Sequence, residues 1–171
     1  MYFAHLPSGY IAVSLLSGRL CRPPVPRRSF MFWGVLGSIA PDFDFMACIL
    51  FYHRMCDHHR FPTHYPLLWL GLLTVSFLWL LLDRYRTSQP ALAVMFFFGG
   101  FLHTILDMFT GHLFLFAPFS FVRQTVSFSE YGFWDPLFLE CFIILWAFIL
   151  WKKQWLLQLL SQMDAWRLFG E

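Results

Sequence analysis

The sequence predicts an all-α integral membrane protein, a bundle of about five hydrophobic helices with a C-terminal amphipathic helix. Of its 171 residues, 58% are hydrophobic and only 13% are charged, whereas soluble domains carry about 25% charged residues. Aromatic residues make up 22% of the chain, as expected for lipid-facing helices and interfacial aromatic belts. The apolar residues also fall into long runs, and runs of about 20 such residues can cross a bilayer as helices.

Polar or Pro-rich segments divide these runs into five predicted helices. They cover about residues 3–18, 29–52, 67–82, 90–117 and 136–151. A basic loop from Arg19 to Arg28 follows the first helix, and Pro41 interrupts the second because proline lacks a backbone donor. Gly99 and Gly100 lie inside the fourth helix, where small residues allow close helix packing.

The last 20 residues differ in pattern from the rest of the chain. We expect residues 1–151 to form one membrane-embedded domain and residues 152–171 to form a separate tail. Apolar residues such as Trp155, Leu159 and Met163 follow a helical stripe in this tail. That stripe favours an amphipathic helix on the membrane surface, and a helix packed against the bundle explains it equally well.

The loop charges predict the orientation in the membrane. Arginine or lysine follows the first, third and fifth predicted helices, and these loops share one side if all five helices span. The positive-inside rule makes that side cytoplasmic. We therefore expect a multi-pass membrane protein whose N-terminus faces outward. The net charge of +2 comes with no basic stripe that would indicate nucleic-acid binding.

Acids and histidines recur within or beside the apolar runs, where ionisable groups are costly and usually functional. His103 and Asp107 are four residues apart, so they share one helix face and could bind one ion together. The alternative is a buried His–Asp hydrogen bond between helices. The predicted orientation places these two residues, and the candidates described next, toward the outer or periplasmic face.

A second cluster follows the proline that interrupts the second helix. Asp42 and Asp44 lie directly after Pro41, so both carboxylates could reach inward from a loop or a helix start. Carboxylates paired with imidazoles suit zinc, manganese or a similar divalent ion. The alternative role for Asp42 is to cap the next helix, which would leave Asp44 unexplained.

The third cluster lies in the polar loop that follows. His59 and His64 could bind metal, and Arg60 could hold a phosphate because its planar guanidinium suits that anion. A solvated loop with Arg60 at the lipid headgroups is the alternative. His5, near the N-terminus, is a further candidate ligand or an interfacial side chain.

The remaining polar residues are weaker candidates. We interpret His53 and His58 as loop residues and keep His112 as a further candidate ligand. Glu140 is an isolated acid in apolar sequence. It could support the site from behind the ligands, but we favour a role in a hydrogen bond between helices. The four cysteines show no CxxC spacing and suit apolar packing.

Taken together, these motifs resemble the YdjM-type membrane-bound metal-dependent hydrolases of bacteria and archaea. The resemblance covers about residues 1–120 and rests on His5, on the stretch from Gly37 to Asp44, on the stretch from His59 to His64, and on His103 with Asp107. It implies a helical protein of a bacterial inner membrane, distantly like zinc-dependent phospholipase C. It also implies the ligand set His5, Asp42, Asp44, His59, His64, His103 and Asp107.

The sequence thus predicts a membrane-bound hydrolase with a divalent-metal site, zinc first and manganese second. The expected substrate is a phosphoester or ester of a membrane lipid. Asp42 or Asp44 would orient a water molecule or accept its proton, and Arg60 would hold the substrate anion. Two alternatives remain open at this point: a metal or proton transporter, and a scaffold whose polar residues only join helices.

Overall fold

The computed structural model describes residues 3–53, 57–109, 113–124 and 136–169, with side chains only as far as Lys153. Its elements are α-helical, with three short 3-10 turns, and the described residues include no strand. The α-helices are α1 (His5–Leu20), α2 (Arg27–Ile39), α3 (Phe43–Tyr52), α4 (Pro66–Asp83), α5 (Gln89–Asp107) and α6 (Pro136–Phe169). The 3-10 turns are η1 (Ala40–Asp42), η2 (His58–Arg60) and η3 (Pro62–His64).

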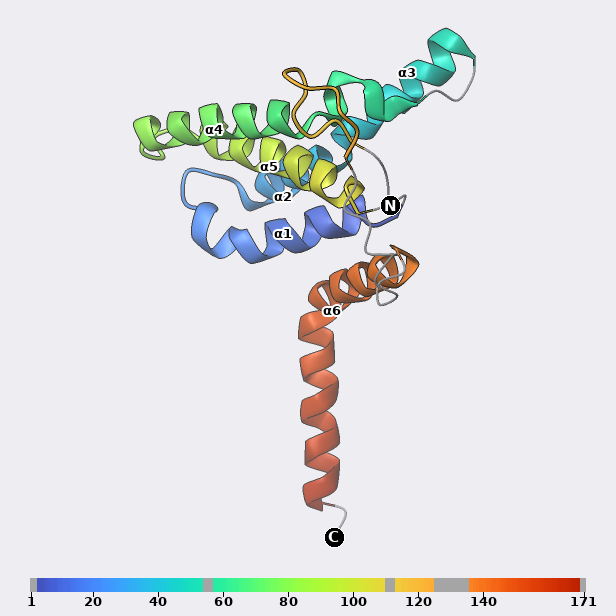
Figure 1. Ribbon diagram of the computed structural model, residues 1–171. Helices are drawn as coiled ribbons and strands as arrows, with labels where there is room; N and C mark the ends of the chain where they lie inside the picture. The colour runs from blue at the N-terminus through green and yellow to red at the C-terminus, as the bar shows by residue number, and fades with distance from the viewer. Residues whose placement is uncertain (1–2, 54–56, 110–112, 125–135, 170–171) are drawn as a thin grey trace.

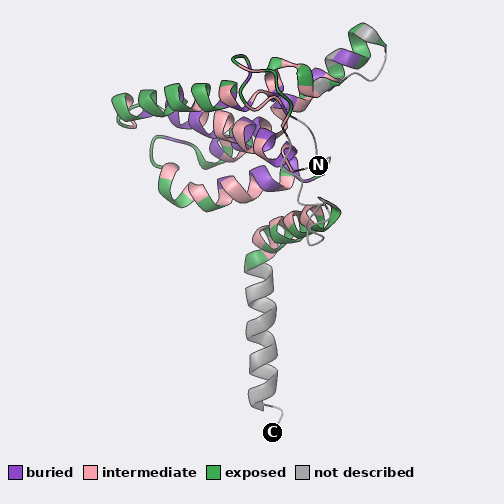
Figure 2. Ribbon diagram, viewed as in Figure 1, coloured by how far each residue is buried: buried purple, intermediate pink, exposed green. Residues whose placement is uncertain are grey.

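Four helices form the bundle that positions the site. Helix α5 packs between α2 and α4, and α1 packs on the other side of α2 (Figure 1). Helix α3 projects from one end of the bundle, and α6 contacts α1. Burial concentrates where α1, α2 and α5 meet, while α4 leaves much of its surface exposed (Figure 2).

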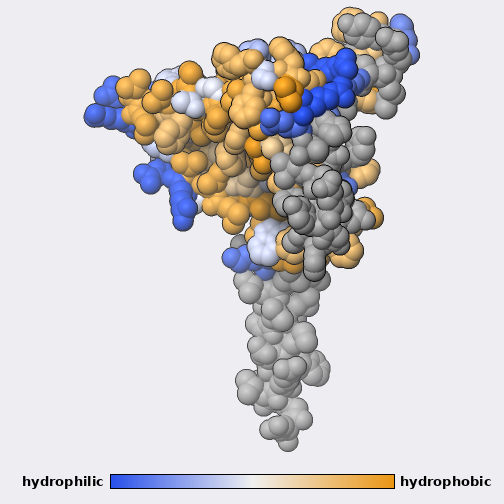
Figure 3. Space-filling view, viewed as in Figure 1, coloured by the Kyte–Doolittle hydropathy of each residue, from blue (hydrophilic) through white to orange (hydrophobic). Residues whose placement is uncertain are grey.

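Three stretches of helix are long and apolar enough to cross a membrane, among the residues the structure describes. They are Arg27–Phe51, Pro66–Asp83 and Gln89–Asp107. Large apolar side chains such as Val75 and Leu82 are exposed on α4, and apolar surface runs along the bundle (Figure 3). This surface suits contact with lipid chains, and the prediction of a helical membrane bundle is confirmed.

Most of the predicted helices form close to their expected bounds. Proline residues stand in the first turns of α4 and α5, where the missing N–H costs nothing. The expected break at Pro41 is the turn η1 between α2 and α3. Helix α6 runs across the boundary predicted between the fifth span and the tail, and the tail's side chains lie outside the described residues.

The predicted fourth helix is too long. We expected helix to about residue 117, but α5 ends at Asp107. Leu113 and Gln124 instead pair through two backbone hydrogen bonds of 2.9 Å, and the loop between them contains Pro118. The helix was predicted to extend too far because the residues after Asp107 are also apolar. Apolar residues such as Phe114 and Phe116 are as compatible with an interfacial loop as with a helix.

Glycines bring α2 and α5 into backbone contact. A Cβ atom added at Gly99 would lie 2.6 Å from both Gly34 O and Ser38 N, and one at Gly37 would lie 2.0 Å from Phe96 O. Only hydrogen fits at these points, so the predicted close packing at Gly99 is confirmed. The contact lies one turn before His103 on α5.

The two ends of the bundle differ in charge. The end formed by the α1–α2 loop and the α4–α5 turn carries the arginines Arg19, Arg22, Arg27, Arg28, Arg84 and Arg86. Arg22 stacks over the ring of Tyr85 at 5.8 Å, which joins this loop and turn. We call this end the arginine end. The candidate metal ligands lie at the opposite end, here called the site end.

Cys48 departs from the expected role of the cysteines. Its side chain is fully buried and is disulfide-bonded, so the interpretation as simple apolar packing is wrong for this residue. Spacing along the sequence gave no signal for the bond. Cys21 and Cys141 are free thiols.

Candidate metal centre

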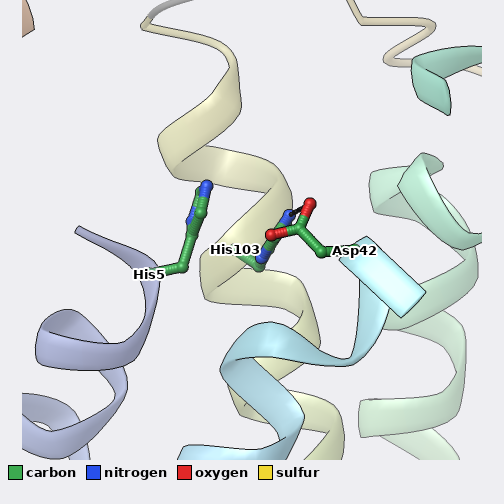
Figure 4. Close-up of side chains that lie close together, drawn as sticks. All are labelled: His5, Asp42 and His103. Carbon is green, nitrogen blue, oxygen red and sulfur yellow. Dashed lines mark ion pairs between the residues drawn. The ribbon is translucent and has the colours of Figure 1, made fainter. Parts of the chain in front are cut away.

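The site end gathers six of the seven predicted ligands from four separate segments. His5 begins α1, Asp42 ends η1, His59 and His64 lie in η2 and η3, and His103 and Asp107 lie in the last turns of α5. They form two groups, His5–Asp42–His103 and His59–His64–Asp107, and within each group the donor atoms lie within 4.8 Å of one another. Figure 4 shows the first group, with its side chains converging from α1, η1 and α5.

Asp107 connects the two groups. Its Oδ1 atom lies 3.1 Å from His5 Nε2, and its Oδ2 atom lies 3.1 Å from His103 Nε2. The same Oδ2 atom is 3.8 Å from His64 Nε2 and 4.0 Å from His59 Nε2. Every histidine of the centre therefore directs a ring nitrogen toward this one buried carboxylate.

Asp42 covers the centre from the side of η1. Its Oδ1 atom lies 3.4 Å from His103 Nε2 and 3.7 Å from His64 Nε2. Its side chain is 40% exposed, whereas those of His64, His103 and Asp107 are 4% exposed or less. Asp42 is thus the carboxylate of the centre that solvent or a substrate can reach.

Partners behind the histidines fix their orientation. His103 Nδ1 donates to the carbonyl oxygen of Ser38 at 2.8 Å, and its ring stacks on that of His5 at 3.7 Å. His64 Nδ1 donates to Asp44 Oδ2 at 2.9 Å. A hydrogen bond at Nδ1 sets the tautomer that leaves Nε2 with its lone pair toward the centre.

Asp44 therefore lies behind His64, outside both groups. Its Oδ2 atom accepts hydrogen bonds from both His64 Nδ1 and the Thr63 hydroxyl. Carboxylates in this position orient a metal-binding histidine and increase its basicity. The structure thus separates the two aspartates that the sequence had treated alike.

The local electrostatics favour a positive charge at the centre. Burial alone would lower the pKa of His64, but hydrogen bonds with Asp42 and Asp44 outweigh it and raise that pKa above its ordinary value. A bound divalent cation would supply the positive charge that the carboxylates favour and would displace the His64 proton.

The residues present fit a divalent metal ion. The buried His103 Nε2 atom makes no hydrogen bond among the described residues, although a buried polar atom normally has a partner. Four imidazoles and two carboxylates supply the nitrogen and oxygen donors that zinc and manganese accept.

Arg60 lies next to the centre in a polar surface cluster. Its Nε atom and Arg123 Nη2 each lie 3.1 Å from Asp57 Oδ2, and its carbonyl oxygen accepts a hydrogen bond from the Tyr65 hydroxyl. The Phe114 ring packs under the Arg123 guanidinium at 5.7 Å. Sequence reasoning missed Asp57 and Arg123: the three-residue spacing could have indicated Asp57, but nothing indicated Arg123.

His53 and Glu140 are outside the two groups. His53 is exposed at the end of α3 and has a left-handed backbone with φ of 49°. His58 lies in η2, and its side chain is outside the described set, as is the whole of His112. Glu140 forms the predicted link between helices, because its Oε1 atom accepts hydrogen bonds from the backbone of Phe3 and Ala4.

The sequence matches the family described as "YdjM inner membrane protein" over residues 1–166, nearly the whole chain. The chain belongs to this family, and the membrane location follows from it together with the three apolar helices. Comparisons with curated proteins and with solved structures gave no match.

Proposed function

For this member of the YdjM inner membrane protein family, we propose the activity of a membrane-bound hydrolase that depends on a divalent metal, zinc first and manganese second. Its substrate is a phosphoester or ester of a membrane lipid. The proposal rests on the convergence, at one end of the bundle, of six side chains that can serve as metal ligands. Within each of the two groups, the donor atoms lie within 4.8 Å of one another. The six residues are His5, Asp42, His59, His64, His103 and Asp107.

The cost of burying these groups supports a metal role over a purely structural one. His103 and Asp107 are almost fully buried, and buried charges are expensive unless they are paired or bind a metal. One His–Asp pair would suffice to join two helices. Six ionisable groups, four of them histidines gathered around Asp107 and Asp42, are better explained as metal ligands than as contacts between helices.

Each protein group then has a distinct chemical role. When bound, a divalent ion polarises the substrate and generates a nucleophile from water at neutral pH. Asp42, the accessible carboxylate, would accept a proton. Arg60 would hold a phosphate through its planar guanidinium, exchanging its contact with Asp57 for one with the anion.

The surroundings of the site favour a lipid substrate. The loop from Leu113 to Gln124 contacts the site end through Tyr65, whose ring lies 6.1 Å from that of Phe121. Phe119 and Phe121 of this loop are 88% and 60% exposed. Exposed aromatic residues beside a polar centre suit the membrane–water interface, where lipid headgroups lie.

Two features support placing the site end at the outer, periplasmic face. The arginine end carries six arginines from two loops, as the positive-inside rule requires of a cytoplasmic side. The disulfide of Cys48 lies on α3, which continues from the site end. Disulfides persist in the periplasm and are rare in the cytosol.

The position of the centre favours hydrolysis over transport. Secondary transporters bind their ions near the middle of the bilayer. Here His5 is the first residue of α1 and Asp107 is the last residue of α5. A site built from helix ends opens toward the interface, where a headgroup can enter.

Metal content tests this proposal directly. Detergent-purified wild-type protein should contain stoichiometric zinc or manganese by elemental analysis, and His103→Ala and Asp42→Ala should lose it. His53→Ala, which removes an exposed histidine outside the centre, is the matched control and should retain the metal. Loaded protein should then release a water-soluble headgroup from lipid vesicles.

Two results would overturn the proposal. Wild-type protein that stays metal-free after reloading with Zn²⁺ and Mn²⁺ would favour the scaffold alternative. Metal uptake into sealed proteoliposomes, without any hydrolysis, would favour the transporter.

A further inference from the structure

A carboxylate on α6, that of the partly buried Glu140, holds the chain segment that leads into His5. Glu140 Oε1 accepts hydrogen bonds from Phe3 N at 2.5 Å and from Ala4 N at 3.1 Å. Ala4 is the N-cap residue of α1, and its own side chain provides no cap. Glu140, 136 positions away, therefore supplies the acceptor that the N-terminal end of α1 lacks.

This contact acts on the residue that follows it. Ala4 is fully buried and His5 is 4% exposed, so neither can move without displacing neighbours. His5 is held from its other side by stacking on His103 and by the 3.1 Å approach of its Nε2 atom to Asp107. The hydrogen bonds to Glu140 thus hold the backbone directly before His5, while the ring contacts hold the His5 side chain.

The choice of a carboxylate fits the position. An acid in the apolar sequence of α6 is costly unless it has a partner. Two backbone N–H groups at the positive end of the α1 dipole stabilise a negative charge. Helix α6 contacts α1 more than any other element, so this hydrogen-bonded pair lies at the main junction between α6 and the bundle.

We propose that Glu140 is a positioning residue for the metal centre, which holds His5 in place for the ion through the backbone of Phe3 and Ala4. This inference rests on the proposed metal site. It gives α6, which contributes no ligand, a direct influence on the affinity of the centre. Residues that orient metal ligands typically change metal affinity about 10- to 100-fold when removed.

Binding of Co²⁺, followed by its visible d–d absorption, tests the proposal without any substrate. Glu140→Ala should weaken Co²⁺ binding about tenfold while the absorption bands at saturation stay those of wild type, because His5 still binds. His5→Ala should change the bands themselves. Glu140→Gln keeps a carbonyl acceptor and should recover most of the affinity.

A double-variant cycle separates positioning from general damage. If Glu140 acts through His5, the His5→Ala/Glu140→Ala protein should bind Co²⁺ no more weakly than His5→Ala alone. Phe148→Ala removes an α6 side chain that lines the groove between α6 and α1, and as a matched control it should leave the affinity within about twofold. If Glu140→Ala does not fold, Glu140→Asp, which shortens the side chain by one methylene, replaces it in the double-variant cycle with His5→Ala.

The outcomes are distinguishable from a failure of the proposed function. Wild-type protein that binds no Co²⁺ would remove the metal centre itself. Wild-type binding with an unchanged affinity in Glu140→Ala, or an equal loss in Phe148→Ala, would overturn the positioning role and leave the centre intact. Independent, additive losses from His5→Ala and Glu140→Ala would overturn it as well.

Discussion

Asp44 shows how one residue's role depends on its partners. It accepts hydrogen bonds from His64 and Thr63 and lies outside both ligand groups. Asp42, two positions earlier, faces His64 and His103 from the centre. The two carboxylates therefore have different surroundings: Asp44 orients a histidine, and Asp42 is open to solvent.

Asp44→Asn tests this distinction. The amide oxygen can still accept a hydrogen bond from His64, but the charge that supports the imidazole is lost, so metal affinity should fall about 10- to 100-fold. Stoichiometry at saturating Zn²⁺, measured by elemental analysis, should stay that of wild type. Complete loss of metal, equal to that in Asp42→Ala, would show that Asp44 is itself a ligand.

The sequence named most of the residues that gather at the site, but their relative geometry was predictable only where local spacing fixes it. His103 and Asp107 are separated by one helical turn, and the structure places their Nε2 and Oδ2 atoms 3.1 Å apart. The roles of Asp42 and Asp44 were not predictable, because they depend on how the turn η1 directs each side chain. Arg123 joins Asp57 across 66 positions, a pairing that no local pattern contains.

At the scale of the elements, the contact between α2 and α5 decides whether the centre can form. The carbonyl oxygen of Ser38 reaches His103 Nδ1 at 2.8 Å because Gly37 and Gly99 let the two backbones touch. Packing of small residues thus sets the orientation of a ligand one turn away.

Gly99→Ala should separate these helices. Its Cβ atom would meet backbone atoms at 2.6 Å, which cannot rotate away, and overpacking of this kind typically costs about 1–3 kcal/mol. The thermal unfolding midpoint in detergent should fall, and Zn²⁺ affinity should fall with it. Gly71→Ala on α4, where an added Cβ meets nothing within 4 Å, is the matched control and should leave both unchanged.

The elements themselves were largely predictable, since long apolar runs and proline positions mark where helices start and stop. The end of α5 was not, because residues 113–117 are as apolar as the helix before them. Their path depends on the bridge between Leu113 and Gln124, a contact that only the folded chain supplies.

At the scale of the whole molecule, the separation of arginine end and site end predicts the membrane orientation. Cys21 lies at the arginine end and is free, and Ser120 lies in the loop at the site end. In intact cells, a membrane-impermeant maleimide should label Ser120→Cys in a background with Cys21→Ser and Cys141→Ser. Cys21, in a protein with Cys141→Ser, should react only after permeabilisation. The reverse labelling pattern would place the site in the cytoplasm.

The candidate ligands are spread along the chain from His5 to Asp107, and the buried pair His103 and Asp107 is the last to be synthesised. Neither ligand group is complete in a nascent chain that stops before α5. If the proposed centre binds a metal ion, the ion can therefore be captured only at the end of membrane insertion, after α5 has packed against the other helices. A chain that fails to insert α5 would carry neither complete ligand group.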